Sequence, residues 1–399
     1  MPTSPRDTST PLDSPQALDR AVRLLAGYRA DDTGVCDPGV PVLAALVAAT
    51  GTGLAVAAAH RATAEWARTV GRGPSHHALY DGGLAGSLVG AYHAARLHPQ
   101  LHRIADRLRE HLLTEADRRP WRTEDVALTD YDLISGPAGT LLALYAGSPE
   151  PPGRAAPAAR HLAALCDEAE LPRLRTGPYA DDPNLSWLHG RINTGMGHGV
   201  AGLVTALTAA VRVTGPEPAL TRALGHAVPW LVRQSFDDAL SVRSWDGAGL
   251  DAPPAPGVRA RQAWCYGNPG VTWAVWDAAD AVGDRETASW ATEAFTGLAD
   301  RYDENLHLFG DEPADRLGLC HGAAGVLVVA DAFARHARLS AAATLRARLL
   351  RHLEARLPEL DETERWHDGL LGGTTGVVAA LLTCGHGGSR AWLPCLGLR

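Results

Sequence analysis

The sequence predicts an all-α protein, an α/α toroid (barrel) of six to seven helical hairpins whose inner helices each begin at a glycine. Three observations predict it: a recurring Gly-x-x-Gly step, an apolar run behind each step, and amphipathic stretches between the copies. The alternation of apolar and polar residues that is typical of half-buried strands is nearly absent. An apolar helix must be buried and an amphipathic helix can cover it, so copies of such a pair close economically into a ring.

The Gly-x-x-Gly step recurs six times at spacings of roughly 50 to 70 residues, which is typical of a repeat architecture. The copies are GLAGSLVGAY at Gly83, GPAGTLLALY at Gly136, GVAGLVTALT at Gly199, GNPGVTWAVW at Gly267, GAAGVLVVAD at Gly322 and GTTGVVAALL at Gly373. We expect a seventh, degraded copy in TGTGLAVAAAH, ending on Gly53. Glycine at the start of an inner helix permits close backbone approach in a crowded centre, and the pattern aligns the helix N-termini at one rim.

The stretches between the copies have the periodicity of amphipathic helices. They lie at 15–29, with Asp13 and Ser14 as candidate N-caps, at 99–119, where Leu101, Ile104, Leu108 and Leu112 share one face, and near 159–170, 218–235, 286–300 and 340–357. Each repeat is therefore predicted to be a two-helix unit. We expect one domain over residues 1–399, with residues 1–12 as a disordered N-terminal tail.

Composition excludes several classes of function. The chain has 399 residues, 46% hydrophobic and 21% charged, and a formal charge of −8, which argues against a nucleic-acid footprint. It contains no lysine, so Schiff-base chemistry and a phosphate-loop lysine are excluded. No signal peptide or membrane span is apparent, and the six cysteines are not closely paired, so we expect a reduced, cytoplasmic protein.

Residues able to do chemistry stand just before the glycines of four consecutive copies: Asp132, His198, Cys265 with Tyr266, and Cys320 with His321. A single buried cysteine is most often a packing residue, as we expect for Cys36, Cys166, Cys384 and Cys395. The shared position in successive repeats instead favours one site. Two thiolates and an imidazole, Cys265, Cys320 and His321, form a three-ligand zinc site whose fourth position is open to water or substrate.

The chain resembles the lanthionine cyclases of the LanC-like family, on WCYG at 264–267, CHG at 320–322 and the upstream HGxxG at His198. The resemblance covers almost the whole chain and implies an α/α toroid with zinc bound by Cys265, Cys320 and His321. It implies catalytic or substrate-polarising roles for His198, Asp132, Arg261 and Tyr266. All seven positions carry the expected residue type. It further implies a standalone class I cyclase, working on a dehydrated precursor peptide from a separate dehydratase, in the cytoplasm or at the periphery of a membrane-associated complex.

The chemistry of that family is addition of a peptide cysteine to dehydroalanine or dehydrobutyrine, giving a thioether ring. A free thiol, with a pKa near ~8.5, is mostly protonated at neutral pH, and zinc deprotonates it. The enolate that follows needs a proton, for which His198 is the candidate general acid. Arg261 is expected to stabilise the enolate oxygen or position the carbonyl. Asp132 either orients His198 or helps to remove the thiol proton, and Tyr266 is either a hydrogen-bond donor or rim packing.

Two alternatives come from other classes. Protein prenyltransferase β-subunits also place a thiolate-activating zinc in an α/α barrel, but they use a carboxylate, a cysteine and a histidine. The second alternative is a LanC-like protein that adds glutathione or another small thiol, or a non-enzymatic scaffold. Residues 236–260, rich in proline and glycine, lead into the zinc motif, and loops of that length are often functional.

Overall fold

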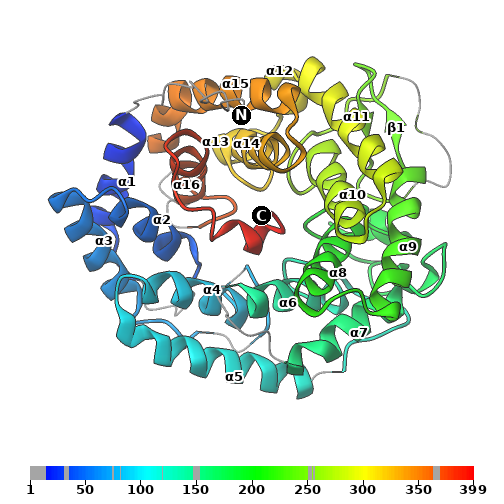
Figure 1. Ribbon diagram of the computed structural model, residues 1–399, viewed down its shortest axis with the longest axis horizontal. Coiled ribbons are helices and arrows are strands. Elements are labelled where there is room, and N and C mark those ends of the chain that lie inside the picture. The colour runs from blue at the N-terminus through cyan, green and yellow to red at the C-terminus, as the bar shows by residue number, and fades with distance from the viewer. Residues whose placement is uncertain are drawn as a thin grey trace, which may run out of the picture.

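The helices form two concentric rings, an α/α toroid, as predicted (Figure 1). The structure, a computed structural model, describes residues 15–30, 36–73, 76–80, 82–118, 120–146, 153–249, 254, 257–362 and 369–399. The expected tail at residues 1–12 and the candidate caps Asp13 and Ser14 lie outside these ranges. Apart from the short helices α12 (Glu304–His307) and α13 (Pro313–Leu317), helices of the outer and inner rings alternate along the chain.

The inner helices are buried on nearly every side, whereas the outer helices bury one face. The inner ring consists of α2 (Gly39–Ala48), α4 (Leu84–Ala95), α6 (Pro137–Tyr145), α8 (Val200–Thr214), α10 (Asn268–Val282), α14 (Ala323–Ala332) and α16 (Thr374–Gly385). The outer ring consists of α1 (Pro15–Gly27), α3 (Gly53–Trp66), α5 (His102–Arg118), α7 (Ala156–Leu165), α9 (Pro218–Arg233), α11 (Arg285–Arg301) and α15 (Ser340–Arg356). The six predicted amphipathic stretches correspond to outer helices, α1, α5, α7, α9, α11 and α15. The ring closes where α2 packs against both α4 and α16.

The seventh inner helix is not the one that the sequence predicts. It is α2, whose residues Gly39–Ala48 include no charged side chain, and not the segment that begins at Gly53. Helix α3 at Gly53–Trp66 is an outer helix, and its Leu54 is 85% exposed. The physical reason is the polar face that His60, Arg61 and Glu65 give this helix, which would be costly to bury.

The repeated glycines are required by close backbone contacts. The second glycine of each step packs against a carbonyl of the loop before it. A Cβ on Gly376 would lie 1.8 Å from the carbonyl oxygen of Leu370, and one on Gly270 would lie 2.0 Å from that of Trp264. Gly267, a first glycine, has a φ of +88°, in the region that favours glycine. The loop can therefore fold back over the first turn of its helix only because these positions lack side chains.

These folded loops are joined to one another by backbone hydrogen bonds, which we call the rim belt. In five of these bonds the amide of the first residue donates to the carbonyl oxygen of the second: Leu79–Ile134, Leu133–Gly197, Met196–Cys265, Cys265–Cys320 and Cys320–Leu371. In the sixth, the Leu370 amide donates to the Asp37 carboxylate. Donor–acceptor distances in the belt are 2.8–3.2 Å. The belt brings the starts of successive inner helices to one side of the ring.

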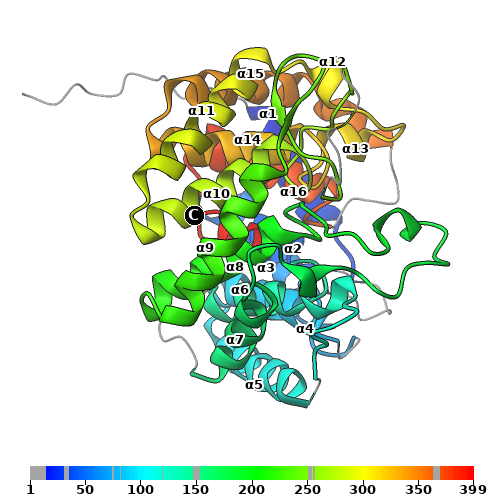
Figure 2. The same cartoon turned by 90° about the vertical axis from the view of Figure 1, so that its right-hand side faces the viewer.

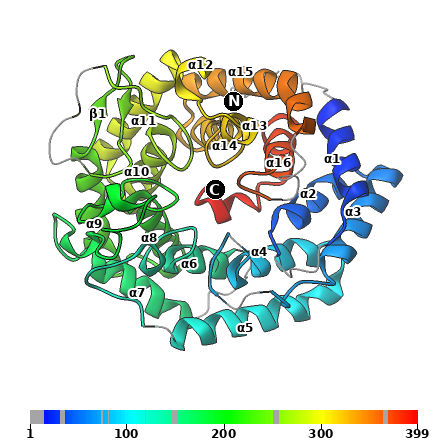
Figure 3. The same ribbon diagram turned by 180° about the vertical axis from the view of Figure 1, so that it is seen from behind.

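The C-terminal segment fills the centre of the toroid (Figures 1 and 3). Trp264 and Trp273 donate their indole N–H groups to the carbonyl oxygens of Leu396 and Gly397, each at 2.9 Å. Tyr80 donates its hydroxyl to the carbonyl oxygen of Cys395, also at 2.9 Å. Seen edge-on, α12 and α13 lie toward one side of the ring and the C-terminal residue toward the other (Figure 2).

Regular β-structure in the described ranges is confined to a two-stranded antiparallel ribbon, β1 (Phe236–Asp237) and β2 (Arg243–Ser244). All six cysteines are free, and the four outside the predicted zinc site, Cys36, Cys166, Cys384 and Cys395, are buried, consistent with packing roles. None of the helices that the structure describes is both long and apolar enough to cross a bilayer.

Two glycine substitutions test the close contacts. Gly376→Ala should destabilise the protein by about 1–3 kcal/mol, because the new methyl group overlaps a backbone carbonyl. Gly225→Ala, in the exposed middle of α9 with no atom within 4 Å of its Cβ position, should stabilise it by about 0.5–1 kcal/mol. Urea unfolding followed by circular dichroism measures both. Equal midpoints for the two variants would contradict the packing argument.

Candidate metal centre

The predicted zinc ligands, far apart in sequence, lie together at the rim. Cys265 precedes α10, and Cys320 and His321 precede α14, so the belt hydrogen bond from the Cys265 amide to the Cys320 carbonyl joins their loops directly. The Sγ atoms and an imidazole nitrogen of the three residues all lie within 4.8 Å of one another. Cys320 Sγ and His321 Nε2 are 3.8 Å apart. Cys265 is buried, and the other two residues are half-buried.

The electrostatics of the three groups suit a cation. A hydrogen bond from the Cys265 thiol lowers the pKa of Cys320 to about 5, and His321 acts in the same direction. Burial raises the pKa of Cys265 well above its usual range, and the hydrogen bond with Cys320 raises the pKa of His321. Tetrahedral zinc with sulfur and nitrogen ligands needs ligand atoms roughly 3.5 Å apart, so small adjustments of these side chains would bind the ion. The donor set and its spacing therefore fit zinc.

Asp132 and His198 form a second group, on the loops before α6 and α8. His198 Nδ1 lies 2.5 Å from Oδ2 of Asp132, whose side chain is fully buried. The other carboxylate oxygen, Oδ1, accepts hydrogen bonds from the Ser135 amide at 2.8 Å and the Ser135 hydroxyl at 3.1 Å. The carboxylate is thus held in place and fixes the ring of His198, whose side chain is 35% exposed.

Arg261 is held by stacking. Its guanidinium carbon lies 4.2 Å from the centre of the Phe309 ring. Its Nη1 is buried without a hydrogen-bond partner within the described ranges. A buried donor without an acceptor costs about 1–3 kcal/mol, so its persistence points to a group that arrives from outside. The charge of Arg261 also lowers the pKa of Cys265, against the larger effect of burial.

The hydroxyl of Tyr266 belongs to a short chain of hydrogen bonds. Its hydroxyl oxygen accepts a hydrogen bond from Asn193 Nδ2 at 2.9 Å, and Asn193 Oδ1 accepts one from the Gly195 amide at 2.8 Å. Burial raises the pKa of Tyr266, so the phenol keeps its proton. The hydroxyl hydrogen therefore remains to be donated.

The seven predicted site residues lie in one region, within electrostatic reach of one another. His198 lowers the pKa of Cys320, and Asp132, Cys265 and Cys320 each raise that of Tyr266. The rim belt also brings the loop of Asp132 next to that of His198, and the loop of His198 next to that of Cys265.

Over residues 42–396 the sequence matches the profile of the family described as lanthionine synthetase C-like protein. The chain belongs to this family. Among solved structures, nisin cyclase is similar in fold, with a TM-score of 0.77 and 18% sequence identity over 95% of this chain and 96% of that chain. A search of the curated proteins finds no match. LanC-like membership favours the lanthionine-cyclase resemblance over the prenyltransferase alternative.

Three further residues shape this LanC-like site and were missed from sequence. Asp315 lies with Oδ1 3.7 Å from Nδ1 of His321, so it can orient the ring with Nε2 toward a metal. Phe309 supports Arg261. Trp187 is 43% exposed, and a Cβ on Gly247 would lie 3.2 Å from its ring and 3.6 Å from that of Tyr266. All three lie in connections without the repeat pattern, so no sequence signal marks them.

Part of the predicted connection at 236–260 does lie beside the site. The Gly249 amide donates to the carbonyl oxygen of Ile192 at 2.7 Å, and the Thr194 amide donates to that of Gly247 at 3.2 Å. These bonds tie residues 247–249 to the loop that carries Asn193, the partner of Tyr266.

Proposed function

We propose that this LanC-like protein is a zinc-dependent lanthipeptide cyclase. It adds the thiol of a peptide cysteine to a dehydroalanine or dehydrobutyrine of the same peptide, which closes a lanthionine or methyllanthionine ring. The observation that carries this proposal is the clustering of Cys265, Cys320 and His321 at the same rim as the Asp132–His198 pair. The substrate is a precursor peptide already dehydrated, which we expect a separate dehydratase to supply in the cytoplasm.

Cys265, Cys320 and His321 are the residues that would hold zinc. When bound, the ion would deprotonate the substrate thiol, which is otherwise mostly protonated at neutral pH. In the addition, a C–S bond forms, the π bond of the dehydro residue breaks, and the α-carbon gains a proton. The thiol loses one proton and the α-carbon gains one, so the mass of the peptide does not change.

The protein's own residues would manage the proton and the charge that develops. His198, protonated and held by Asp132, is suited to deliver a proton from Nε2 to the α-carbon, and the buried carboxylate stabilises its charged form. The short contact therefore favours an orienting role for Asp132. Arg261 has a free buried donor for the enolate oxygen, and Tyr266 has a hydroxyl hydrogen for the peptide backbone.

The test is incubation of the zinc-loaded protein with a dehydrated precursor peptide. We expect loss of free thiol without change in mass, with fragmentation blocked inside the new rings. The same reaction run with glutathione separates the small-thiol alternative, because that addition raises the mass of the peptide. A peptide that retains its free thiols, or that gains only glutathione, would contradict the cyclase proposal.

Removal of one ligand should remove the metal. We expect about one zinc per wild-type chain, and for Cys320→Ala the loss of most of that zinc and of all cyclisation. Cys166→Ala is the control, because it makes the same substitution at a buried cysteine in the loop after α7, and this variant should keep its zinc. Elemental analysis of purified protein measures the content. Full activity in zinc-free wild-type protein would overturn the zinc dependence.

Substitution of the proposed acid should spare the metal. His198→Asn should keep its zinc and slow single-turnover ring formation about 10²–10⁴-fold, because no other imidazole replaces the proton donor. Asp132→Asn should slow the reaction in the same direction, since the carboxylate stabilises the charged ring. Unchanged rates in His198→Asn would refute the general-acid role.

The carboxylate beside His321 should contribute to metal affinity. Asp315→Asn should weaken zinc binding about 10–100-fold, as removal of a partner of a ligating histidine usually does. Asp311→Asn replaces an exposed acid of the same segment, so it changes the net charge by the same amount and should leave the zinc affinity unaltered. Competition with a chromogenic chelator gives both dissociation constants. Equal affinities for the two variants would show that Asp315 does not orient His321.

A further inference from the structure

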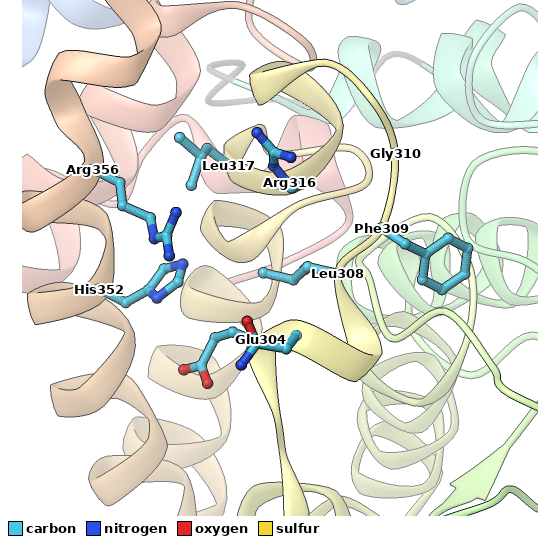
Figure 4. A pocket seen from close by; sticks show the side chains of 9 residues that line it. Glu304, Leu308, Phe309, Gly310, Arg316, Leu317, His352 and Arg356 are labelled. Atoms are coloured by element: carbon cyan, nitrogen blue, oxygen red, sulfur yellow. The ribbon is translucent and has the colours of Figure 1, made fainter.

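A cavity of about 370 Å³ lies between α15 and the segment that carries α12 and α13 (Figure 4). Its size falls within the range of small-ligand pockets. Two buried leucines, Leu308 and Leu317, contribute apolar surface. The ionisable side chains around them are Glu304, Arg316, His352 and Arg356. In Figure 4, His352 and Arg356 project from α15 toward the segment that carries Leu308 and Arg316.

The charges around this cavity leave one cation unmatched. Glu304 is paired with Arg348 at 3.1 Å, and Arg356 is paired with Glu359 at 2.9 Å. Arg316 has no ion pair or hydrogen bond with any residue that the structure describes. Burial lowers the pKa of His352, so this ring is neutral near pH 7 and can donate or accept a hydrogen bond. The cavity therefore presents one free guanidinium beside apolar surface.

Two residues that line the cavity, Phe309 and Arg316, adjoin residues of the candidate metal centre. Phe309 lines it, but the ring points away from the other lining residues (Figure 4) and stacks on Arg261. Arg316 directly follows Asp315, the residue 3.7 Å from His321. A peptide whose cysteine reaches the metal would run past these two residues. Because Phe309 stacks on Arg261 and Arg316 follows Asp315, a peptide residue close in sequence to that cysteine lies within reach of the cavity.

We propose that this cavity binds an acidic side chain of the peptide substrate, through Arg316, at a fixed spacing from the reacting cysteine. This inference rests on the proposed function, because it takes the ligand to be the peptide that the metal centre modifies. A carboxylate can accept two parallel hydrogen bonds from a guanidinium, and the surrounding leucines strengthen that pair by excluding water. The stem of the acidic residue would contact Leu308 and Leu317. The chemistry of the reaction needs only a thiol and a dehydro residue. The cavity would add a requirement on the sequence of the peptide substrate.

The test uses fluorescein-labelled peptides in which one cysteine and one aspartate, set in glycine and serine, are separated by one to six residues on either side. Each has a twin with asparagine in place of aspartate. Binding to the zinc-loaded full chain is measured by fluorescence anisotropy. At one or two spacings the aspartate peptide should bind about tenfold more tightly than its twin. Arg316→Gln should abolish that difference without weakening the twin, and Arg351→Gln, an exposed arginine of α15, should preserve it.

The outcomes separate this inference from the proposed function. Equal binding of aspartate and asparagine peptides at every spacing would overturn it, as would a preference for aspartate that is the same at all spacings. A loss of affinity in Arg316→Gln that is equal for the aspartate and asparagine peptides would also overturn it. Replacement of the peptide cysteine by serine tests the metal centre instead. Serine peptides should bind more weakly and lose the dependence on spacing, because nothing then anchors that residue at the metal. If they bind as tightly as the cysteine peptides, the role of the metal centre fails, whereas Arg316→Gln still reports whether the cavity binds the acid.

Discussion

The rest of the structure depends on the rim belt, the hydrogen bonds that link the loop before one inner helix to the loop before the next. Each loop reaches its neighbour only because it folds back over the first turn of its helix, and it can fold back only where glycine leaves room. A single local constraint, repeated from the loop before α4 round to the loop before α2, therefore aligns the helix N-termini, and the packing of α2 against α4 closes the toroid. At Asp37 a carboxylate takes the place of a backbone acceptor, since the amide of Leu370 donates to it.

The belt also sets the geometry of the site, because two of the candidate zinc ligands, Cys265 and Cys320, are part of it. Cys265 accepts a belt hydrogen bond from Met196 and donates one to Cys320, so its backbone is held from both sides. The two sulfur atoms are positioned by rigid loops rather than by long side chains. His198 stands between the loops of Asp132 and Cys265 in the same way. Pre-organisation of this kind lowers the entropy cost of bringing a metal, a proton donor and a peptide together.

Much of the fold and the clustering of the candidate zinc ligands could be predicted because the elements that carry them repeat. Six inner helices carry the Gly-x-x-Gly step, and Cys265, Cys320, His198 and Asp132 all stand within four residues before its first glycine. The prediction of the seventh inner helix was wrong because the segment that forms it, Gly39–Ala48, lacks the Gly-x-x-Gly step. Its loop makes the belt contact through the Asp37 carboxylate instead. Asp315, Phe309 and Trp187 could not be found because they lie outside the repeated helices, Asp315 in the short helix α13 and the other two in the connections. Their positions depend on tertiary packing, which leaves no period in the sequence.

Charge balance explains why Arg261 is held by an aromatic ring rather than by an acid. Two thiolates and a neutral imidazole would balance a divalent zinc ion, and Asp132 balances a protonated His198. A substrate thiolate, and the enolate formed from it, would each add one negative charge to this neutral arrangement. Arg261 makes no ion pair in the part of the chain that the structure describes, and Phe309 fixes it without neutralising it. An acid in place of Phe309 would hold the guanidinium equally well but would cancel the charge that Arg261 offers to the developing anion.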